Sequence, residues 1–139
     1  MINSITNSKT ESYKHVKVNL GNIYLFEDFF VGEFDEGVDI NFSNFSDISE
    51  IVKAYFENRP FGFISNRVNS YSLNLNDAEL FNASFPNLKA YAVVVYNSLT
   101  EKVFEIENHF FKFNRKAFTD IYESISWVKN CISSAQLIE

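Results

Sequence analysis

Residues 90–96 read Ala-Tyr-Ala-Val-Val-Val-Tyr, a continuous apolar run that is rich in β-branched side chains. A run of this length without polar alternation is typical of a strand that is buried on both faces. Such strands lie in the middle of a sheet that helices cover. This stretch therefore predicts a central strand of an α/β sheet, and the rest of the chain must supply the elements around it.

A second short apolar run, Phe61 to Ser65, follows Pro60 and ends abruptly in polar residues. Polar groups that follow a central parallel strand lie at the sheet edge where α/β proteins usually bind ligands. Arg67 could pair with an anionic group, and the amides and hydroxyls offer hydrogen bonds. The candidate binding loop comprises Ser65, Asn66, Arg67, Asn69, Ser70, Tyr71 and Ser72.

Two other interpretations of the candidate binding loop remain open. Asn tolerates left-handed backbone, and Ser and Asn side chains stabilise turns, so the loop could be purely structural. One of its serines could instead be phosphorylated, which would change its charge at a helix entrance or in a partner interface.

The remaining elements are predicted from periodicity. Residues 14–31 are expected to form a β-hairpin that turns at Gly21-Asn22, with a return strand that continues to Val31 past an irregularity at Glu27-Asp28. Val38 to Asn41 could be a short extra strand or an extended loop. Helical patterns with caps or proline stops cover residues 47–58, 76–85, 98–110 and 119–132, and a short strand or extended segment is expected within 112–117.

The third of these helices has a capping box, Ser98 with Glu101, at its start. Its apolar residues Leu99, Val103 and Ile106, followed by Phe110, share one face. We expect that face to pack against the sheet.

This order of elements predicts a mixed sheet with right-handed crossovers and about four helices. At 139 residues, the chain is expected to form a single α/β domain over residues 13–132. Residues 1–12 are polar and are predicted to be a flexible N-terminus without a signal peptide, and residues 133–139 a C-terminal tail.

Charge and hydropathy disfavour several classes of partner. The formal net charge is −6, so binding to nucleic acid or to an anionic lipid surface is not expected. No apolar run approaches the roughly 20 residues of a membrane-spanning helix. Cys131 is the only cysteine, so an intramolecular disulfide is not expected, and we predict a cytoplasmic protein.

No motif predicts catalysis, a cofactor or a metal. His15 and His109 lie far apart in the sequence, and neither is near Cys131 at ligand spacing. The four glycines do not form a phosphate-binding loop, and no Gly-x-Ser-x-Gly elbow occurs. We therefore predict no catalytic, cofactor-binding or metal-binding residues, while an enzyme with an unrecognised site stays a third hypothesis.

Aromatic residues are unusually frequent, with 16 Phe and 7 Tyr. They could fill a Phe-rich core, or they could line an apolar pocket for a small ligand.

Two segments resemble bacterial proteins of the SpoIIAA-like, STAS-related group. Residues 60–67, Pro-Phe-Gly-Phe-Ile-Ser-Asn-Arg, look like the central strand of that group. Residues 118–128 resemble its typical end, with an aromatic residue, an acidic helix start, and Trp127 followed by an aliphatic residue. The resemblance implies an α/β domain with a mixed sheet and helices mainly on one side.

The resemblance implies two kinds of role. STAS domains of anti-sigma factor antagonists bind a partner protein and are switched by phosphorylation of a serine after a central strand, whereas lipid-transfer domains with a related fold bury an apolar ligand. The Asp-Ser-Ser-Gly-type motif of the antagonists is absent, because the chain reads Ser65-Asn66-Arg67 at that place. No phosphoacceptor is therefore assigned from the family.

We expect a noncatalytic STAS-like regulatory or protein-binding module that meets an unknown protein partner near residues 65–72. This hypothesis predicts a polar rim and no deep cavity. The alternative is a carrier of a small apolar ligand or lipid in an aromatic-lined pocket. A homodimer formed through an edge strand remains open.

Overall fold

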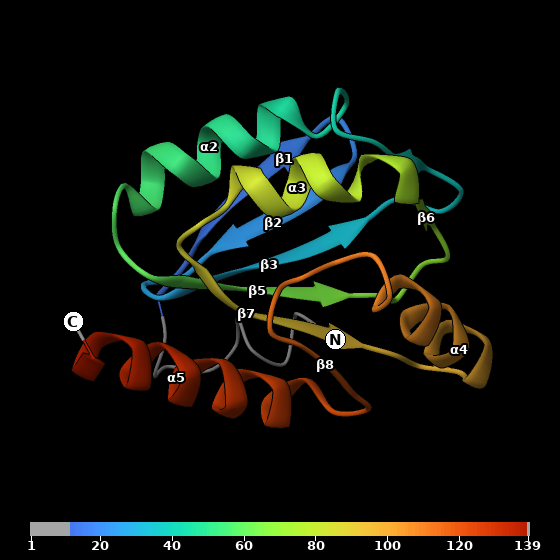
Figure 1. Ribbon diagram of the computed structural model, residues 1–139. Helices are drawn as coiled ribbons and strands as arrows, with labels where there is room; N and C mark the ends of the chain where they lie inside the picture. The colour runs from blue at the N-terminus through green and yellow to red at the C-terminus, as the bar shows by residue number, and fades with distance from the viewer. Residues whose placement is uncertain (1–11, 139) are drawn as a thin grey trace.

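Six strands form one mixed sheet in the order β1-β2-β3-β5-β7-β8 (Figure 1). The computed structural model describes residues 12–138. Strands β1 to β3 are antiparallel neighbours, and β3, β5, β7 and β8 run parallel. The strands are β1 (Lys14–Val18), β2 (Gly21–Leu25), β3 (Phe29–Phe34), β5 (Phe61–Asn66), β7 (Leu88–Val94) and β8 (Arg115–Phe118). A separate two-stranded sheet pairs β4 (Asp39–Ile40) with β6 (Ser72–Leu73).

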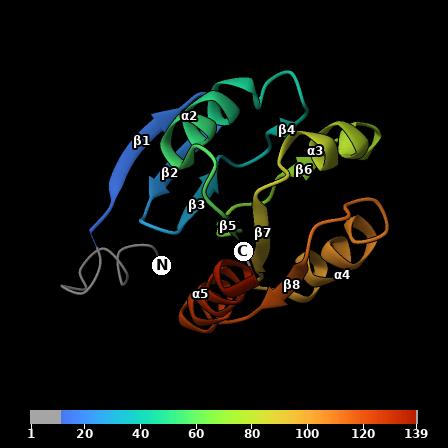
Figure 2. The ribbon, with the colours of Figure 1, turned by 60° about the vertical axis from the view of Figure 1, so that its left-hand side comes forward.

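Four α-helices accompany the sheet within the described residues: α2 (Ser46–Phe56), α3 (Ala78–Ser84), α4 (Ser98–Glu107) and α5 (Ile121–Ile138). Helices α2 and α3 lie over one face of the sheet and α5 lies over the other, while α4 stands beyond the end of β7 (Figures 1 and 2). The predicted class, an α/β fold with a mixed sheet and about four helices, is confirmed. None of the helices in residues 12–138 is both long and apolar enough to cross a membrane.

The core has two layers, and β7 contributes to both. Its residues Tyr91 and Val93 belong to the aromatic layer under α2 and α3, whereas Ala90, Ala92 and Val94 belong to the layer under α5. This alternation is the two-residue period of a strand with both faces covered. The prediction of a buried central strand is confirmed, and the small alanines let α5 approach the sheet closely.

The predicted N-terminal hairpin is a three-stranded meander. Val18 pairs with Gly21, so the turn residues are Asn19 and Leu20 instead of Gly21-Asn22. Gly21 lies in β2 with a φ of +146°, and a Cβ there would stand 2.5 Å from the Glu33 carbonyl oxygen. Crowding from the neighbouring strand β3, which the sequence pattern does not reveal, therefore fixes a glycine at this position.

The return strand also ends earlier than predicted. The Phe26 N–H donates to the Phe29 carbonyl at 2.8 Å and closes a tight turn over residues 27–28. The rings of Phe26 and Phe29 stack at 4.7 Å between their centroids. The apolar residues from Phe29 onward therefore form a separate strand, β3, which places β5 beside it.

The observed helix ends differ from the predicted ones, and polar side chains near them have partners that the sequence pattern does not show. Asp77, at the start of α3, accepts the Phe42 N–H at 2.8 Å, and a 3₁₀ turn (Leu75–Asp77) precedes α3. Helix α4 is capped by Asn97, which accepts the Thr100 N–H at 2.8 Å, instead of by Ser98. The predicted tail from 133 is helical up to 138 within α5. The predicted flexible N-terminus lies outside the described residues except for residue 12.

Gly62 allows α5 to pack on β5, because a Cβ at this position would collide with Cγ1 of the fully buried Val128. We expect Gly62→Ala to lower the free energy of unfolding by about 1–3 kcal/mol, the usual cost of overpacking a core. Urea denaturation measures this loss. The double variant Gly62→Ala/Val128→Ala should lose less than the sum of the two single variants; additive losses would contradict the contact.

Candidate functional site

The structure divides the candidate binding loop into a buried part and an exposed part. Ser65, Asn66 and Arg67 are 0%, 1% and 4% exposed. Residues 68–70 and 72 are exposed, and Tyr71 is half-buried. The candidate residues are therefore neighbours in the fold, but they do not share one accessible surface.

The first two buried residues hydrogen-bond inside the protein. The Ser65 hydroxyl hydrogen-bonds the Tyr71 hydroxyl. Asn66 donates to Glu33 Oε2 at 2.6 Å and accepts from the Tyr96 hydroxyl at 2.5 Å. Burial raises the pKa of Tyr96 to about 12, and the nearby Glu33 carboxylate adds to this effect. Ser65 and Asn66 thus hold the end of β5 in place and are closed to a large ligand.

The exposed residues also make contacts that order the loop. Asn69 donates to the Phe34 carbonyl at 3.0 Å, and the Ser72 hydroxyl donates to Asp39 at 2.7 Å. The Ser70 N–H donates to Glu36 at 2.5 Å. The structural interpretation therefore explains much of the loop, and Val68 and Ser70 are the residues whose side chains face solvent without such a role.

Arg67 forms a buried ion-pair network with two residues that are distant in the sequence. Its Nη2 lies 2.7 Å from Glu107 Oε1 and 3.0 Å from Oε2. Arg115 Nη2 lies 3.0 Å from the same Oε1, and Arg115 Nη1 donates to Asn108 Oδ1 at 3.2 Å. The Arg67 Nε donates to the Tyr71 hydroxyl at 3.2 Å. The network joins the loop after β5, helix α4 and strand β8.

The network holds more positive than negative charge. Glu107 is the only acidic residue in the described part of the chain that forms an ion pair with either arginine. Burial lowers the pKa of Arg67, but Tyr71 and Glu107 raise it more, so the guanidinium stays charged. Two cations and one carboxylate are thus buried together, with a surplus of one positive charge.

Aromatic rings surround the Arg115 guanidinium. Its central carbon lies 4.5 Å from the ring centroid of Tyr91, 4.8 Å from that of Phe104 and 5.2 Å from that of Phe111. Such cation–π contacts offset part of the cost of burying the charge. The Nε–H of Arg115 nevertheless has no hydrogen-bond acceptor among the described residues.

The sequence did not reveal Glu107 and Arg115 as members of this site. Glu107 follows Glu105 and reads as part of a solvated charged face. The chain from α4 to β8 brings Arg115 to it, and no local pattern encodes that contact. Arg67 was predicted as an anion-binding residue, and the anion that it binds in the structure is the protein's own Glu107.

Helix α4 is rotated relative to its predicted orientation. Phe104 and Glu107 are its buried residues, whereas Leu99 is 69% exposed and Ile106 55% exposed. The buried face is displaced by about one residue, or roughly 100° around the helix axis. The pairing of Glu107 with two arginines explains this orientation, since the carboxylate must point inward. The expectation that the apolar face of this helix packs on the sheet was wrong.

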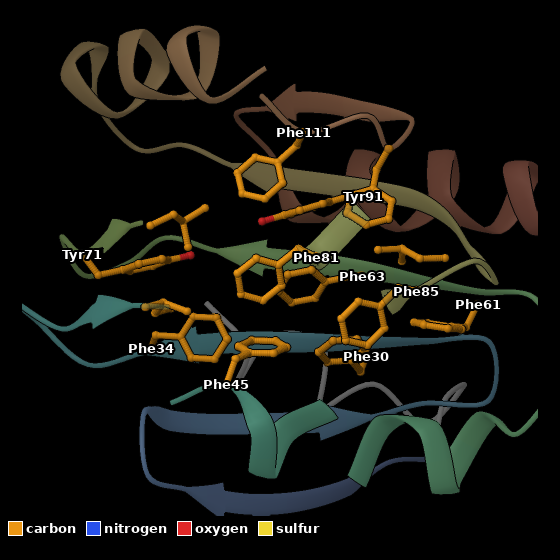
Figure 3. Close-up of a pocket in the computed structure, with 14 residues that line it drawn as sticks. Phe30, Phe34, Phe45, Phe61, Phe63, Tyr71, Phe81, Phe85, Tyr91 and Phe111 are labelled. Carbon is orange, nitrogen blue, oxygen red and sulfur yellow. The ribbon is translucent and has the colours of Figure 1, made fainter. Parts of the chain in front are cut away.

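An aromatic cavity of about 50 Å³ lies between the sheet and helices α2 and α3 (Figure 3). Of its fourteen lining residues, Tyr71 and Tyr91 alone carry a side-chain polar atom. Figure 3 shows both hydroxyls, in red, pointing into the cavity. Burial raises the pKa of Tyr91, so this hydroxyl is neutral at pH 7. The cavity is well below the roughly 300–1,000 Å³ of usual ligand pockets.

Other side chains that could bind a metal or act as a nucleophile do not gather into a site among the described residues. Among residues 12–138, no group of three or more His, Cys, Asp or Glu side chains could hold a metal ion. Burial raises the pKa of the half-buried Cys131, although a hydrogen bond from Asn114 lowers it in part, so the thiol is not activated.

Comparison with solved structures identifies the fold. An uncharacterized protein of the DUF3478 family from Shewanella loihica PV-4, described as having a SpoIIAA-like fold, matches with a TM-score of 0.53. The match covers 88% of this chain and 98% of that one, at 11% sequence identity. The chain has a SpoIIAA-like fold. No family model and no curated protein matches the sequence.

In this SpoIIAA-like fold, the loop after the central strand β5 holds Arg67 at the point where β5 and β7 end. The resemblance seen in residues 60–67 and 118–128 is thereby confirmed at the level of the fold. Residues 118–128 form the end of β8 and the first turns of α5, where Trp127 packs on Phe118 at 5.6 Å between ring centroids.

Proposed function

We propose that this SpoIIAA-like protein is a noncatalytic protein-binding module that docks a partner through helix α4. The proposed contact surface, called the α4 stripe, consists of Leu99, Val103, Ile106 and Phe110. The observation that supports it is the exposure of large apolar side chains on this helix and in the turn after it, where Leu99, Ile106 and Phe110 are 69%, 55% and 45% exposed.

The spacing of the α4 stripe suits a helix that lies in an apolar groove of another protein. Leu99, Val103 and Ile106 follow one another at intervals of four and three residues, which places them on one side of the helix, and Phe110 lies in the turn just after it. Exposed apolar side chains gathered on one face mark interaction sites in soluble proteins. Glu107 and Phe104 anchor an adjacent side of α4, roughly 100° around the helix axis, to the domain, so the stripe is presented on a fixed support.

The charge around the α4 stripe favours one class of partner. Glu101 and Glu105 are exposed on α4 and Lys102 is its exposed cation, and the whole chain carries a net charge of −6. A groove with an apolar floor and basic edges would complement this surface. A second copy of the chain would bring the same acidic flanks, so like-charge repulsion disfavours a homodimer on this face.

The candidate binding loop becomes part of this proposal through its exposed portion. Arg67 ties the loop to α4 through Glu107, so the two segments would move as one unit. Val68 is 41% exposed and extends the apolar contribution. The proposed surface thus combines the α4 stripe with residues 68–70. The buried residues Ser65, Asn66 and Arg67 do not contact the partner but hold the loop in position.

Capture from lysate of the native cell tests the proposal. We expect the double variant Leu99→Glu/Ile106→Glu to fold with a free energy of unfolding within about 0.5 kcal/mol of the original protein, because both sites are exposed. It should lose a partner that the original protein and a matched control, Leu80→Glu on α3, both retain; Leu80 is 51% exposed.

Two results would overturn the proposal. A partner that still binds the α4 double variant would have to use another surface. A dimer of the original protein in sedimentation that dissociates in the double variant would identify a second copy as the occupant, in place of a basic-edged partner. A photocrosslinker placed at position 99 should join the captured partner and should fail with the chain itself.

A further inference from the structure

The aromatic cavity and the buried arginines share part of their structure. Tyr71, Tyr91 and Phe111 are among the residues that line the cavity. The Arg67 guanidinium lies 4.9 Å from the ring centroid of Tyr71, and Arg115 lies against Tyr91 and Phe111. Both guanidinium groups therefore lie behind aromatic rings that line the cavity.

The described residues neutralise only part of the positive charge behind these rings. Arg67 and Arg115 share the single carboxylate of Glu107, and the buried Arg115 Nε–H has no acceptor. An unpaired donor and a surplus buried charge are both costly, and an anion in the cavity would offset the surplus charge. The cluster therefore has one positive charge in excess, and one additional negative charge would balance it.

The shape of the cavity restricts the rest of the ligand. A cavity of about 50 Å³ is roughly a third of the 150 Å³ that accommodates a benzene ring. An unbranched alkyl chain is narrower than a ring. Half-buried residues such as Leu73, Leu88 and Phe113 also line the cavity, so it reaches the surface, and a chain longer than the cavity would extend through its mouth.

We propose that the aromatic cavity binds a short unbranched aliphatic carboxylate, with the acid group beside Tyr71, Tyr91 and Phe111. The Tyr91 hydroxyl, which points into the cavity (Figure 3), donates to the carboxylate. The Tyr71 hydroxyl accepts from Arg67 Nε–H and from the Ser65 hydroxyl, which leaves its own proton for the carboxylate, and the surplus charge of Arg67 and Arg115 stabilises the bound anion. The alkyl chain lies among the phenylalanine rings. This site is independent of the α4 stripe and does not rest on the proposed protein-binding function.

Hexanoate and its neutral isostere hexanamide test the charge requirement. Binding is measured at pH 7 by ligand-observed NMR and by the shift in melting temperature. We expect the dissociation constant of hexanoate to be at least about tenfold lower than that of hexanamide. Equal binding of the two probes would show a purely apolar cavity and would overturn the proposal, as would no binding of hexanoate at concentrations up to several millimolar.

Two variants locate the site. Arg115→Met leaves Arg67 and Glu107 as a balanced pair, so the variant should fold, and the preference for hexanoate over hexanamide should fall to less than about twofold. Leu73→Phe fills the cavity from its half-buried wall and should abolish binding of both probes. If either variant binds hexanoate as the original protein does, the carboxylate lies elsewhere and the proposal is wrong.

Discussion

Replacing Glu107 by glutamine is expected to lower the free energy of unfolding by about 3–5 kcal/mol, the range for removal of one partner from a buried ion pair. The substitution keeps the size of the side chain but removes the carboxylate that Arg67 and Arg115 share at 2.7 and 3.0 Å. Two buried guanidinium groups would then remain without a counter-charge. Urea denaturation followed by circular dichroism measures the loss.

The matched control is Glu105→Gln, on the same helix and exposed to solvent. It should change the free energy of unfolding by no more than about 0.5 kcal/mol. The double variant Glu107→Gln/Arg115→Met removes one cation together with the carboxylate and should recover part of the loss. A Glu107→Gln variant as stable as the control would show that the network does not hold α4 in its rotated position.

Truncating Phe63 to alanine is expected to cost about 3–5 kcal/mol, as for other buried phenylalanines. Phe63 lies on the central strand β5 and is 6% exposed. Its ring stacks on Phe30 at 4.4 Å and lies 4.8 Å from that of Tyr91, measured between centroids. The variant loses these contacts and enlarges the aromatic cavity, because rings on three strands cannot all collapse into the space.

The enlarged cavity supplies a second measurement. Benzene should raise the melting temperature of Phe63→Ala more than that of the original protein, since a ligand that binds only the folded state stabilises it. Phe110→Ala is the control, because Phe110 is 45% exposed, and it should lose less than about 1 kcal/mol. Equal losses in the two variants would show that the aromatic layer is not the main source of stability.

Strong local patterns predicted the elements of the fold correctly. The β-branched run at 90–96 became β7, and Phe61 to Ser65 became β5 in the middle of the sheet. The spacing of the last helix predicts an apolar stripe of Ile121, Ile125, Val128 and Ile132; Ile125 is half-buried and the other three are buried. These elements follow from their own periodicity, because each one must bury an apolar face whatever lies opposite.

The predictions that failed depended on groups distant in the sequence. The turn at Asn19-Leu20 and the separate strand β3 follow from how three strands pair. The helix that was predicted to begin at residue 76 begins at Ala78, after a 3₁₀ turn that Asn74 caps. Helix α4 is the clearest case. Its periodicity indicates one buried face, but the ion pairs of Glu107 outweigh the burial of Leu99 and Ile106.

For the candidate site, the sequence by itself determined that a polar loop with an arginine follows the central strand. Tertiary structure alone decided that Ser65, Asn66 and Arg67 are buried, that Glu107 pairs with both Arg67 and Arg115, and that Leu99 and Ile106 on α4 face solvent. The physical reason is that burial of a charge requires a partner charge, and the partners here lie 40 and 8 residues from Glu107 along the chain. Local periodicity carries no information about such distant pairings, so it predicted the strands and helices but could not predict which face of α4 turns inward.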